Sequence, residues 1–264
     1  MSSSQPRAKI EQTLSRRHPL QRLESPSKGF SGALHNDAFG WHFQFLTIIG
    51  LLLTTLTFFF GLLADLTSTT STTASPTSTT ASDSPPSTTT LSTRLFTAKN
   101  YIALIATPLE ITISLLYWGI RTIDGNLLVR TDLPLPPFFW DIGFHLVPAV
   151  VLSLDAILLS PPWPTSPMNE QAPTITLVLS TLVAFAYWLW IELCYTQNGY
   201  YPYPLFEMLS TNQRIGLFVV SGVIMWVVGG LSRAVYAKLN GYESVEELDK
   251  VKRSKAMGAN GKWE

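Results

Sequence analysis

The sequence predicts an all-α protein built as a polytopic bundle of transmembrane helices. Only 14% of its 264 residues are charged, and its mean hydropathy is +0.21. It also contains five apolar segments that each approach the roughly 20 residues a helix needs to cross the hydrocarbon core. The alternative is a soluble protein with five buried helices. Such helices would carry a polar face, which these segments barely show.

The five expected spans form one domain over residues 41–238. Within lipid, a helix satisfies its own backbone hydrogen bonds, so each apolar segment is expected to be helical throughout. Aromatic side chains that prefer the membrane interface stand near several ends, as Trp41, Trp118 and Tyr236 do. In chain order, the spans are 43–66, 101–120, 138–159, 174–194 and 215–236.

Three polar segments complete the chain. Residues 1–40 are basic and have no apolar core typical of a signal peptide. Residues 67–93 are almost entirely Ser, Thr, Pro and Ala, a composition that predicts disorder. Residues 239–264 form a polar C-terminal tail. The clustering of Lys and Arg at both ends favours two cytosolic termini, which requires an even number of crossings rather than five.

Composition also excludes several kinds of partner and site. The formal net charge is zero, so we expect no nucleic-acid partner. A single cysteine, Cys194, excludes an internal disulfide and a cysteine-based zinc site. The sequence contains no P-loop, no zinc-protease motif and no Gly-x-Ser-x-Gly motif. We therefore expect neither a metal nor a cofactor.

Ionisable residues inside spans are costly, so they are the first candidates for a functional site. With a rise of 1.5 Å per residue, Asp141 would lie about 5 Å below one membrane face, His145 about 10 Å and Glu110 about 15 Å. Glu192 would lie about 3 Å below the same face and reach the interface. Asp155 would lie near the opposite face, as an interfacial end residue.

Each candidate also has a structural interpretation that the sequence leaves open. Asp141 and His145 are four residues apart and share a helix face, so they could either form a catalytic pair or satisfy one another as buried polar groups. Glu110 could serve a pocket or bridge two helices. Thr47, about 6 Å deep, would ordinarily bond its own helix backbone. Residues 194–214, rich in Tyr and Pro, could cover a pocket on this face.

Three stretches occur in this order along the chain: FGWHFQFLTIIGLLLTTLTFFFGLLADL, WDIGFHLVPAVVLSLDAI and NGYYPYPLFEMLSTNQRI. Their order and spacing resemble the androgen-induced gene 1 family of multipass membrane proteins, from about Phe39 to Tyr236. The resemblance implies a hydrolase of fatty-acid esters of hydroxy fatty acids in the endomembrane system, with the endoplasmic reticulum favoured, or in the plasma membrane. It also implies that Thr47 is the nucleophile and His145 the base. From their positions in the spans, Asp141 could orient His145, and Glu110 could be a further polar residue of the pocket.

Six spans are expected for this family, so the resemblance predicts that the first span is absent here, between about Leu34 and Phe39. The implied substrate is a lipid ester, and membrane lipids are the expected surroundings. Two other functions stay open: a membrane protein without catalysis, in which Thr47 and His145 only pack the bundle, and a small transporter or proton relay that uses Glu110, Asp141 and His145.

Overall fold

The computed structural model describes residues 38–68, 91–129, 137–160, 163 and 171–240. All regular elements in these ranges are helical, and no strand occurs among them. In chain order they are η3 (Trp41–Gln44), α2 (Leu46–Ser68), α3 (Leu91–Ile123), η5 (Gly125–Leu127), α4 (Phe138–His145), α5 (Val147–Leu154), the π-helical turn η6 (Asp155–Leu159), α6 (Ala172–Asn198), α7 (Pro204–Met208) and α8 (Thr211–Asn240).

Five stretches within the described part are long and apolar enough to cross a membrane, which confirms the predicted all-α bundle. They are Leu46–Ser68, Leu91–Ile123, Phe138–Leu159, Ala172–Asn198 and Thr211–Asn240. The second begins at Leu91 rather than at residue 101, because its first turns are polar and apolarity alone does not mark them as helical. The first span was predicted to be absent between about Leu34 and Phe39, and most of that stretch belongs to residues 1–37, which lie outside the described ranges. Residues 69–90 and the residues after Asn240 also lie outside them.

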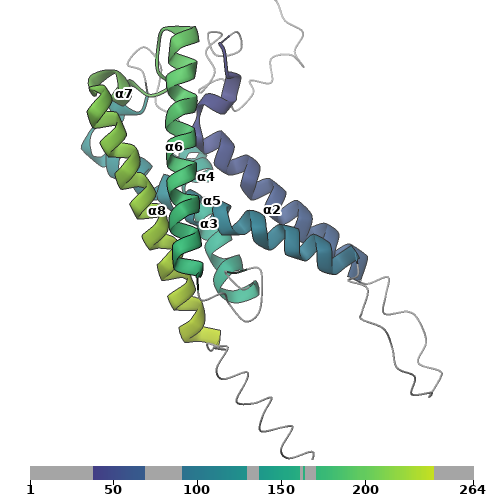
Figure 1. The fold of residues 1–264 in the computed structure, drawn as a ribbon. Coiled ribbons are helices and arrows are strands. Elements are labelled where there is room, and N and C mark those ends of the chain that lie inside the picture. Colours follow the sequence, from purple (N-terminus) through teal and green to yellow (C-terminus); the bar gives the residue numbers. More distant parts are fainter. Residues whose placement is uncertain (1–37, 69–90, 130–136, 161–162, 164–170, 241–264) are drawn as a thin grey trace, which may run out of the picture.

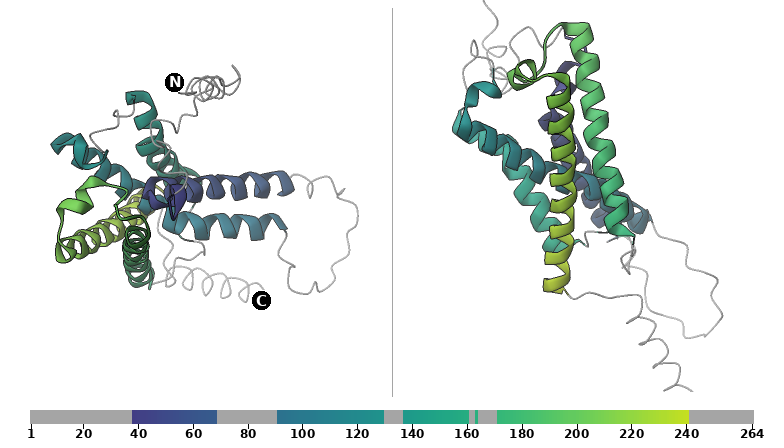
Figure 2. Two further views of the ribbon diagram at one scale, coloured as in Figure 1. Left: turned by 90° about the horizontal axis from the view of Figure 1, so that it is seen from above. Right: turned by 60° about the vertical axis from the view of Figure 1, so that its left-hand side comes forward.

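The helices form two neighbouring pairs. Helices α2 and α3 run side by side in opposite directions, and α6 and α8 form the second pair (Figure 1). Seen from above, the far ends of α2 and α3 lean away from the rest of the bundle (Figure 2). Helix α3 packs against α8 at Pro108 and Gly229, where a Cβ added at Gly229 would lie at an ordinary van der Waals distance, 3.7 Å, from Pro108 Cβ.

The third span is not one continuous helix. Helix α4 ends at His145, Leu146 has φ −121°, and α5 begins at Val147. Pro148 explains the break, because proline has no N–H to bond the carbonyl one turn earlier and its ring clashes with that turn. The break places His145 at a helix end, one turn after Asp141.

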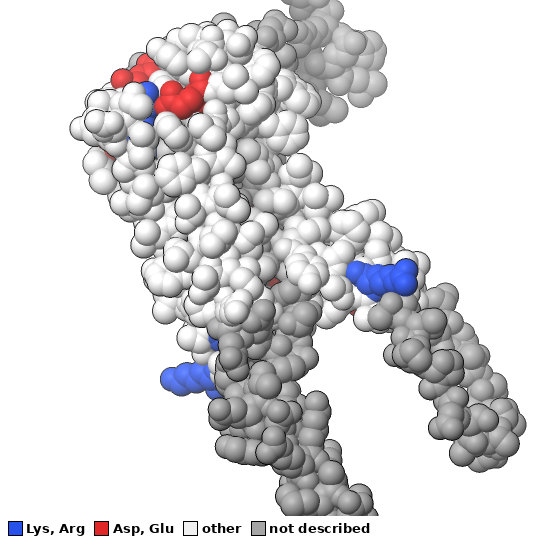
Figure 3. Space-filling model, in the orientation of Figure 1, with Lys and Arg blue, Asp and Glu red and all other residues white. Residues whose placement is uncertain are grey.

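Charged side chains are absent from the broad middle of the visible surface. In Figure 3 the described acidic and basic residues lie at the two ends of the bundle, and the surface between them is almost wholly uncharged. Large apolar side chains of the spans, such as Leu62, Val150 and Leu182, are exposed. An uncharged, apolar belt of this kind is what contact with lipid requires.

Candidate functional site

Thr47 lies buried in the first turn of α2, facing the segment that connects α6 with α8. Its side chain is hydrogen-bonded with the phenol of Tyr203, and backbone groups of Leu46 and Thr47 also bond that phenol. The first N–H groups of a helix have no partner within the helix, so this end of α2 has donors to offer. Burial raises the pKa of Tyr203, and the bonds to Thr47 and to the backbone oppose that rise. The phenol therefore stays protonated at neutral pH.

His145 is held in place from two sides. Its ring stacks flat on Tyr117, with 3.5 Å between ring centroids and 2° between the planes. Its Nδ1 lies 3.0 Å from Asp141 Oδ1 and 3.1 Å from the Asp141 carbonyl oxygen. Both oxygens accept, so Nδ1 carries the proton and Nε2 is the basic nitrogen of the neutral ring. The spacing of four residues thus does bring Asp141 and His145 into contact.

Asp141 is completely buried, and two residues of α3 compensate its charge. Arg121 forms an ion pair with it, and the Tyr117 phenol donates a hydrogen bond to it. Arg121 Nη1 also donates to the Tyr117 hydroxyl over 3.0 Å. A carboxylate held this way keeps its charge and its orientation beside His145.

A single cavity of about 120 Å³ links the surroundings of Thr47 to those of His145. Its wall includes Leu46, the neighbour of Thr47; Tyr203, which bonds Thr47; and Tyr117, which stacks on His145. Most other wall residues are aliphatic or aromatic side chains of α3, α6 and α8. Such a lining suits an acyl chain, with a few polar groups placed at one end.

Glu110 occupies a different place. The hydroxyl of Thr54 donates to its Oε1 over 3.2 Å, across the α2–α3 contact. Its Oε2 has no hydrogen-bond partner among the described residues. Gly50 makes room for the carboxyl, because a Cβ there would lie 2.5 Å from Oε1. Glu110 bridges two helices and does not belong to the wall of the cavity, which matches the structural interpretation left open above.

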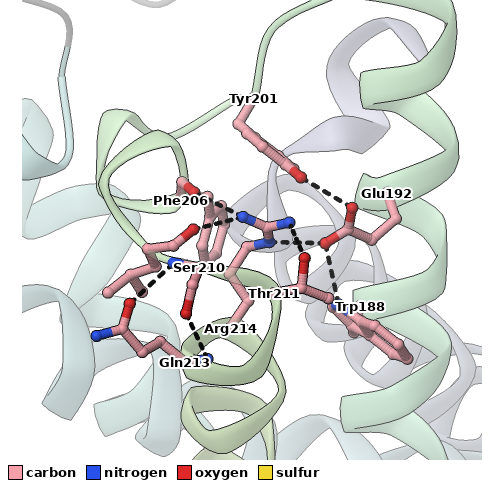
Figure 4. A network of polar contacts seen from close by, with 9 residues as sticks. Trp188, Glu192, Tyr201, Phe206, Ser210, Thr211, Gln213 and Arg214 are labelled. Carbon is pink, nitrogen blue, oxygen red and sulfur yellow. Dashed lines mark hydrogen bonds and ion pairs between the residues drawn. The ribbon is translucent and has the colours of Figure 1, made fainter.

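The segment between α6 and α8 is fixed by Glu192, which was expected only to reach the interface. Arg214 Nε donates to Glu192 over 2.8 Å, as does the Tyr201 hydroxyl, and Trp188 donates over 3.1 Å (Figure 4). Arg214 also donates to the carbonyl oxygen of Leu209. Burial and the bond to Glu192 raise the pKa of Tyr201 to about 12. This network anchors the segment that carries Tyr203 over the cavity.

Asp155 lies near the end of the third span, as expected, but its side chain is buried in the bundle rather than exposed. It forms an ion pair of 2.7 Å with Lys99 of α3, whose ammonium also donates to Ser160. The sequence interpretation missed Lys99 because the span was expected to begin at residue 101. The sequence signal for this ion pair was a lysine just before one apolar segment together with an aspartate inside another, ten residues after His145.

No group of three His, Cys, Asp or Glu side chains that could hold a metal occurs in the described part of the chain. The polar groups around Thr47 and His145 are instead hydroxyls, one imidazole, and one carboxylate paired with the Arg121 guanidinium. This set can transfer protons and present a hydroxyl nucleophile.

Comparison with known proteins decides the family. The sequence profile described as FAR-17a/AIG1-like protein matches residues 21–237. This chain belongs to the FAR-17a/AIG1-like family. A relative in this group is the UPF0641 membrane protein PJ4664.05 of Schizosaccharomyces pombe, 32% identical over 188 residues, which are 71% of this chain and 71% of the relative. No solved structure matches. The FAR-17a/AIG1-like match covers all five helical spans up to residue 237 of α8, and the protein is thus an integral multipass membrane protein.

Proposed function

We propose that this protein is an integral-membrane lipid-ester hydrolase that cleaves fatty-acid esters of hydroxy fatty acids, with Thr47 as nucleophile and His145 as base. The observation that carries the proposal is the apolar cavity whose wall joins the neighbours of both residues. The carboxylate–imidazole contact at Asp141 supports it, because it leaves Nε2 of a neutral His145 able to accept a proton. We further propose that the protein acts in the endomembrane system or the plasma membrane.

In the first half of the reaction, His145 removes the proton from Thr47 Oγ as Oγ attacks the ester carbonyl carbon. The tetrahedral intermediate then collapses, the bond to the hydroxy fatty acid breaks, and His145 returns the proton to the departing oxygen. An acyl-threonine remains. In the second half, His145 deprotonates a water molecule that attacks the acyl carbon, and the proton returns to Thr47 as the acyl–Oγ bond breaks.

Tyr203 is the proposed stabiliser of the oxyanion in both halves. Its phenol is protonated and bonds the Thr47 side chain, so a substrate carbonyl at Thr47 lies within its reach. The start of α2 adds the positive end of a helix dipole beside the same atoms. No residue with this role was recognisable from the sequence.

The proposal is tested by ester hydrolysis with purified protein in nanodiscs. Thr47→Ala should abolish turnover, and His145→Ala should lower kcat by about 10²- to 10⁴-fold, the usual contribution of a general base. Thr55→Ala and His42→Ala are matched controls, because Thr55 is an exposed threonine of the same helix that bonds only the backbone carbonyl of Leu51.

Control variants with wild-type rates and inactive Thr47 and His145 variants of unchanged thermal stability would support the assignment. Full turnover in both the Thr47→Ala and His145→Ala proteins would refute it. Such a result would favour the alternative in which both residues only pack the bundle.

A further inference from the structure

A second, smaller cavity lies toward the other end of the bundle. Its volume is about 30 Å³, and α3, α6, α8 and η6 surround it. Unlike the first cavity, its wall is rich in polar side chains: Asn100, Asp155, Ser160, Thr176, Ser232 and Arg233. We call it the Arg233 cavity.

The charges around the Arg233 cavity do not balance. Lys99 and Asp155 neutralise one another in their ion pair. Arg233 of α8 is only 8% exposed, and its single hydrogen bond within the described residues goes to the Thr176 hydroxyl, over 3.1 Å. No carboxylate of the described part pairs with it. Among the described residues, one buried positive charge is therefore left without a counter-ion.

The depth of the Arg233 guanidinium makes this imbalance costly. The side chain turns back toward the start of α8, and its Nη1 lies 3.6 Å from the position of a Cβ at Gly229. Gly229 is about 16 Å from the end of α8 at Asn240, from the helical rise, well inside the span. A lone charge at such depth is disfavoured by several kcal/mol unless an anion or water compensates it.

One buried polar atom at the same cavity has no hydrogen-bond partner among the described residues. It is the amide oxygen of Asn100, a residue only 5% exposed. Asn100 Oδ1 accepts hydrogen bonds, as a carboxylate does, so the charged donors that this cavity offers to an anion are those of Arg233. About 10–15 Å³ holds one water molecule, so the cavity accommodates roughly two heavy atoms, the size of a carboxylate's oxygen pair rather than of a phosphodiester.

One face of α8 joins this cavity to the larger one. Phe218, Gly222 and Met225 border the larger cavity, and Met225, Gly229 and Arg233 border the smaller. Met225 belongs to both walls, and a methionine side chain adjusts readily to a neighbouring chain. From Phe218 to Gly229 the helix rises about 16 Å, a distance that an extended long-chain acyl group can cover.

We propose that Arg233 binds the carboxylate of a long-chain fatty acyl ligand whose hydrocarbon chain extends past Met225 into the larger cavity. The proposal deepens the proposed hydrolase function: in an ester of a hydroxy fatty acid, the free carboxylate would be held at Arg233 while the ester lies near Thr47. The site then selects lipids with an anionic end at a set distance from the ester.

The test measures binding of palmitic acid and of 1-hexadecanol to the purified full chain in phosphatidylcholine nanodiscs. Both probes have the same chain, and neither contains an ester, so the result does not depend on catalysis by Thr47. The wild type should bind palmitic acid about tenfold to a hundredfold more tightly, the usual worth of charged hydrogen bonds. Arg233→Gln should remove that preference, and Arg233→Lys should retain part of it.

Lys238→Gln is the matched control, because Lys238 is an exposed cation on the same helix. Its preference should equal that of the wild type. Equal binding of the two probes by the wild type, or an unchanged preference in a folded Arg233→Gln protein, would overturn the proposal. Phosphatidylglycerol that displaces palmitic acid from the wild type would show instead that the site takes a phospholipid headgroup, which also overturns it.

A second measurement needs no variant, in case Arg233→Gln does not fold. A palmitic acid with a photoreactive diazirine next to the carboxyl group should label residues 100–108 or 225–233, and one with the diazirine at the methyl end should label residues 203–206. The reverse pattern would contradict the proposal. Because hydrolysis is measured separately, a hydrolase without this preference and a fatty-acid-binding protein without hydrolysis remain distinguishable.

Discussion

Thr47 differs from Thr55 and Thr57 of the same helix in the partner of its hydroxyl. A threonine in a span usually bonds a carbonyl of its own helix, as Thr55 and Thr57 do here. Thr47 lies in the first turn of α2 and bonds Tyr203 instead. Its neighbours are therefore a phenol and the N-terminal end of a helix, which favour negative charge close to the hydroxyl.

Replacing Tyr203 with phenylalanine tests its role as oxyanion donor. Loss of one such donor costs about 10²- to 10³-fold in kcat, so we expect a fall of that size with little change in KM. Tyr195→Phe is a suitable control, because Tyr195 is a tyrosine of α6 outside the cavity wall. A Tyr203→Phe protein with wild-type kcat would remove the phenol from the mechanism. Steady-state hydrolysis rates give the answer.

At the scale of elements, the connection between α6 and α8 forms part of the cavity wall. Tyr203 and Phe206 from this connection line the cavity, and the pair Glu192–Arg214 joins its two flanking helices. Proline precedes both Leu205 and Tyr203, which restricts the backbone before any contact forms. A Tyr- and Pro-rich connection over a pocket was predicted from sequence, but its anchor on Glu192 was not.

The Tyr201–Glu192 bond makes this connection sensitive to alkaline pH. The pKa of Tyr201 is about 12 in the folded protein, against about 10 for an exposed tyrosine. Between these values the unfolded chain has lost the proton and the folded chain has kept it, so stability falls as pH rises. Below about pH 10 the contribution of Tyr201 is constant.

Tyr201→Phe should therefore unfold at a lower temperature than the wild type near pH 8, by the worth of one hydrogen bond, about 1 kcal/mol. The difference should shrink as the pH approaches 11, because only the wild type loses stability through this group. Thermal unfolding in detergent at several pH values measures it. A difference in melting temperature between the two proteins that stays constant or widens toward pH 11 would contradict the raised pKa of Tyr201.

At the scale of the whole molecule, two buried polar clusters hold the spans in register. Lys99 and Asp155 join α3 to the end of the third span, and Asp141 with Arg121 joins the same two spans near the other end. In lipid, apolar side chains contribute little to helix association, so polar contacts and close packing decide it. The aspartate ten residues after His145 thus has a structural role as the counter-ion of Lys99.

Asp155→Asn should leave the Lys99 ammonium buried without its carboxylate. Removal of one partner of a buried pair costs about 3–5 kcal/mol, so the melting temperature should fall strongly. Asp65→Asn, at an exposed aspartate near the end of α2, should change little. The double variant Lys99→Met with Asp155→Leu should recover much of the loss. An Asp155→Asn protein as stable as the wild type would show that another group compensates the charge of Lys99.

The sequence by itself determined the five helices and the pairing of Asp141 with His145. Both are local properties: a helix in lipid bonds its own backbone, and residues four apart on a helix are neighbours. Only the tertiary structure decided that Tyr203 meets Thr47, that Lys99 meets Asp155 and that Arg233 meets no carboxylate in the described residues. These contacts join different elements, and they depend on how each helix is rotated and how deep it lies. Hydropathy carries no information on either, because a lipid-facing side and a packed side are equally apolar.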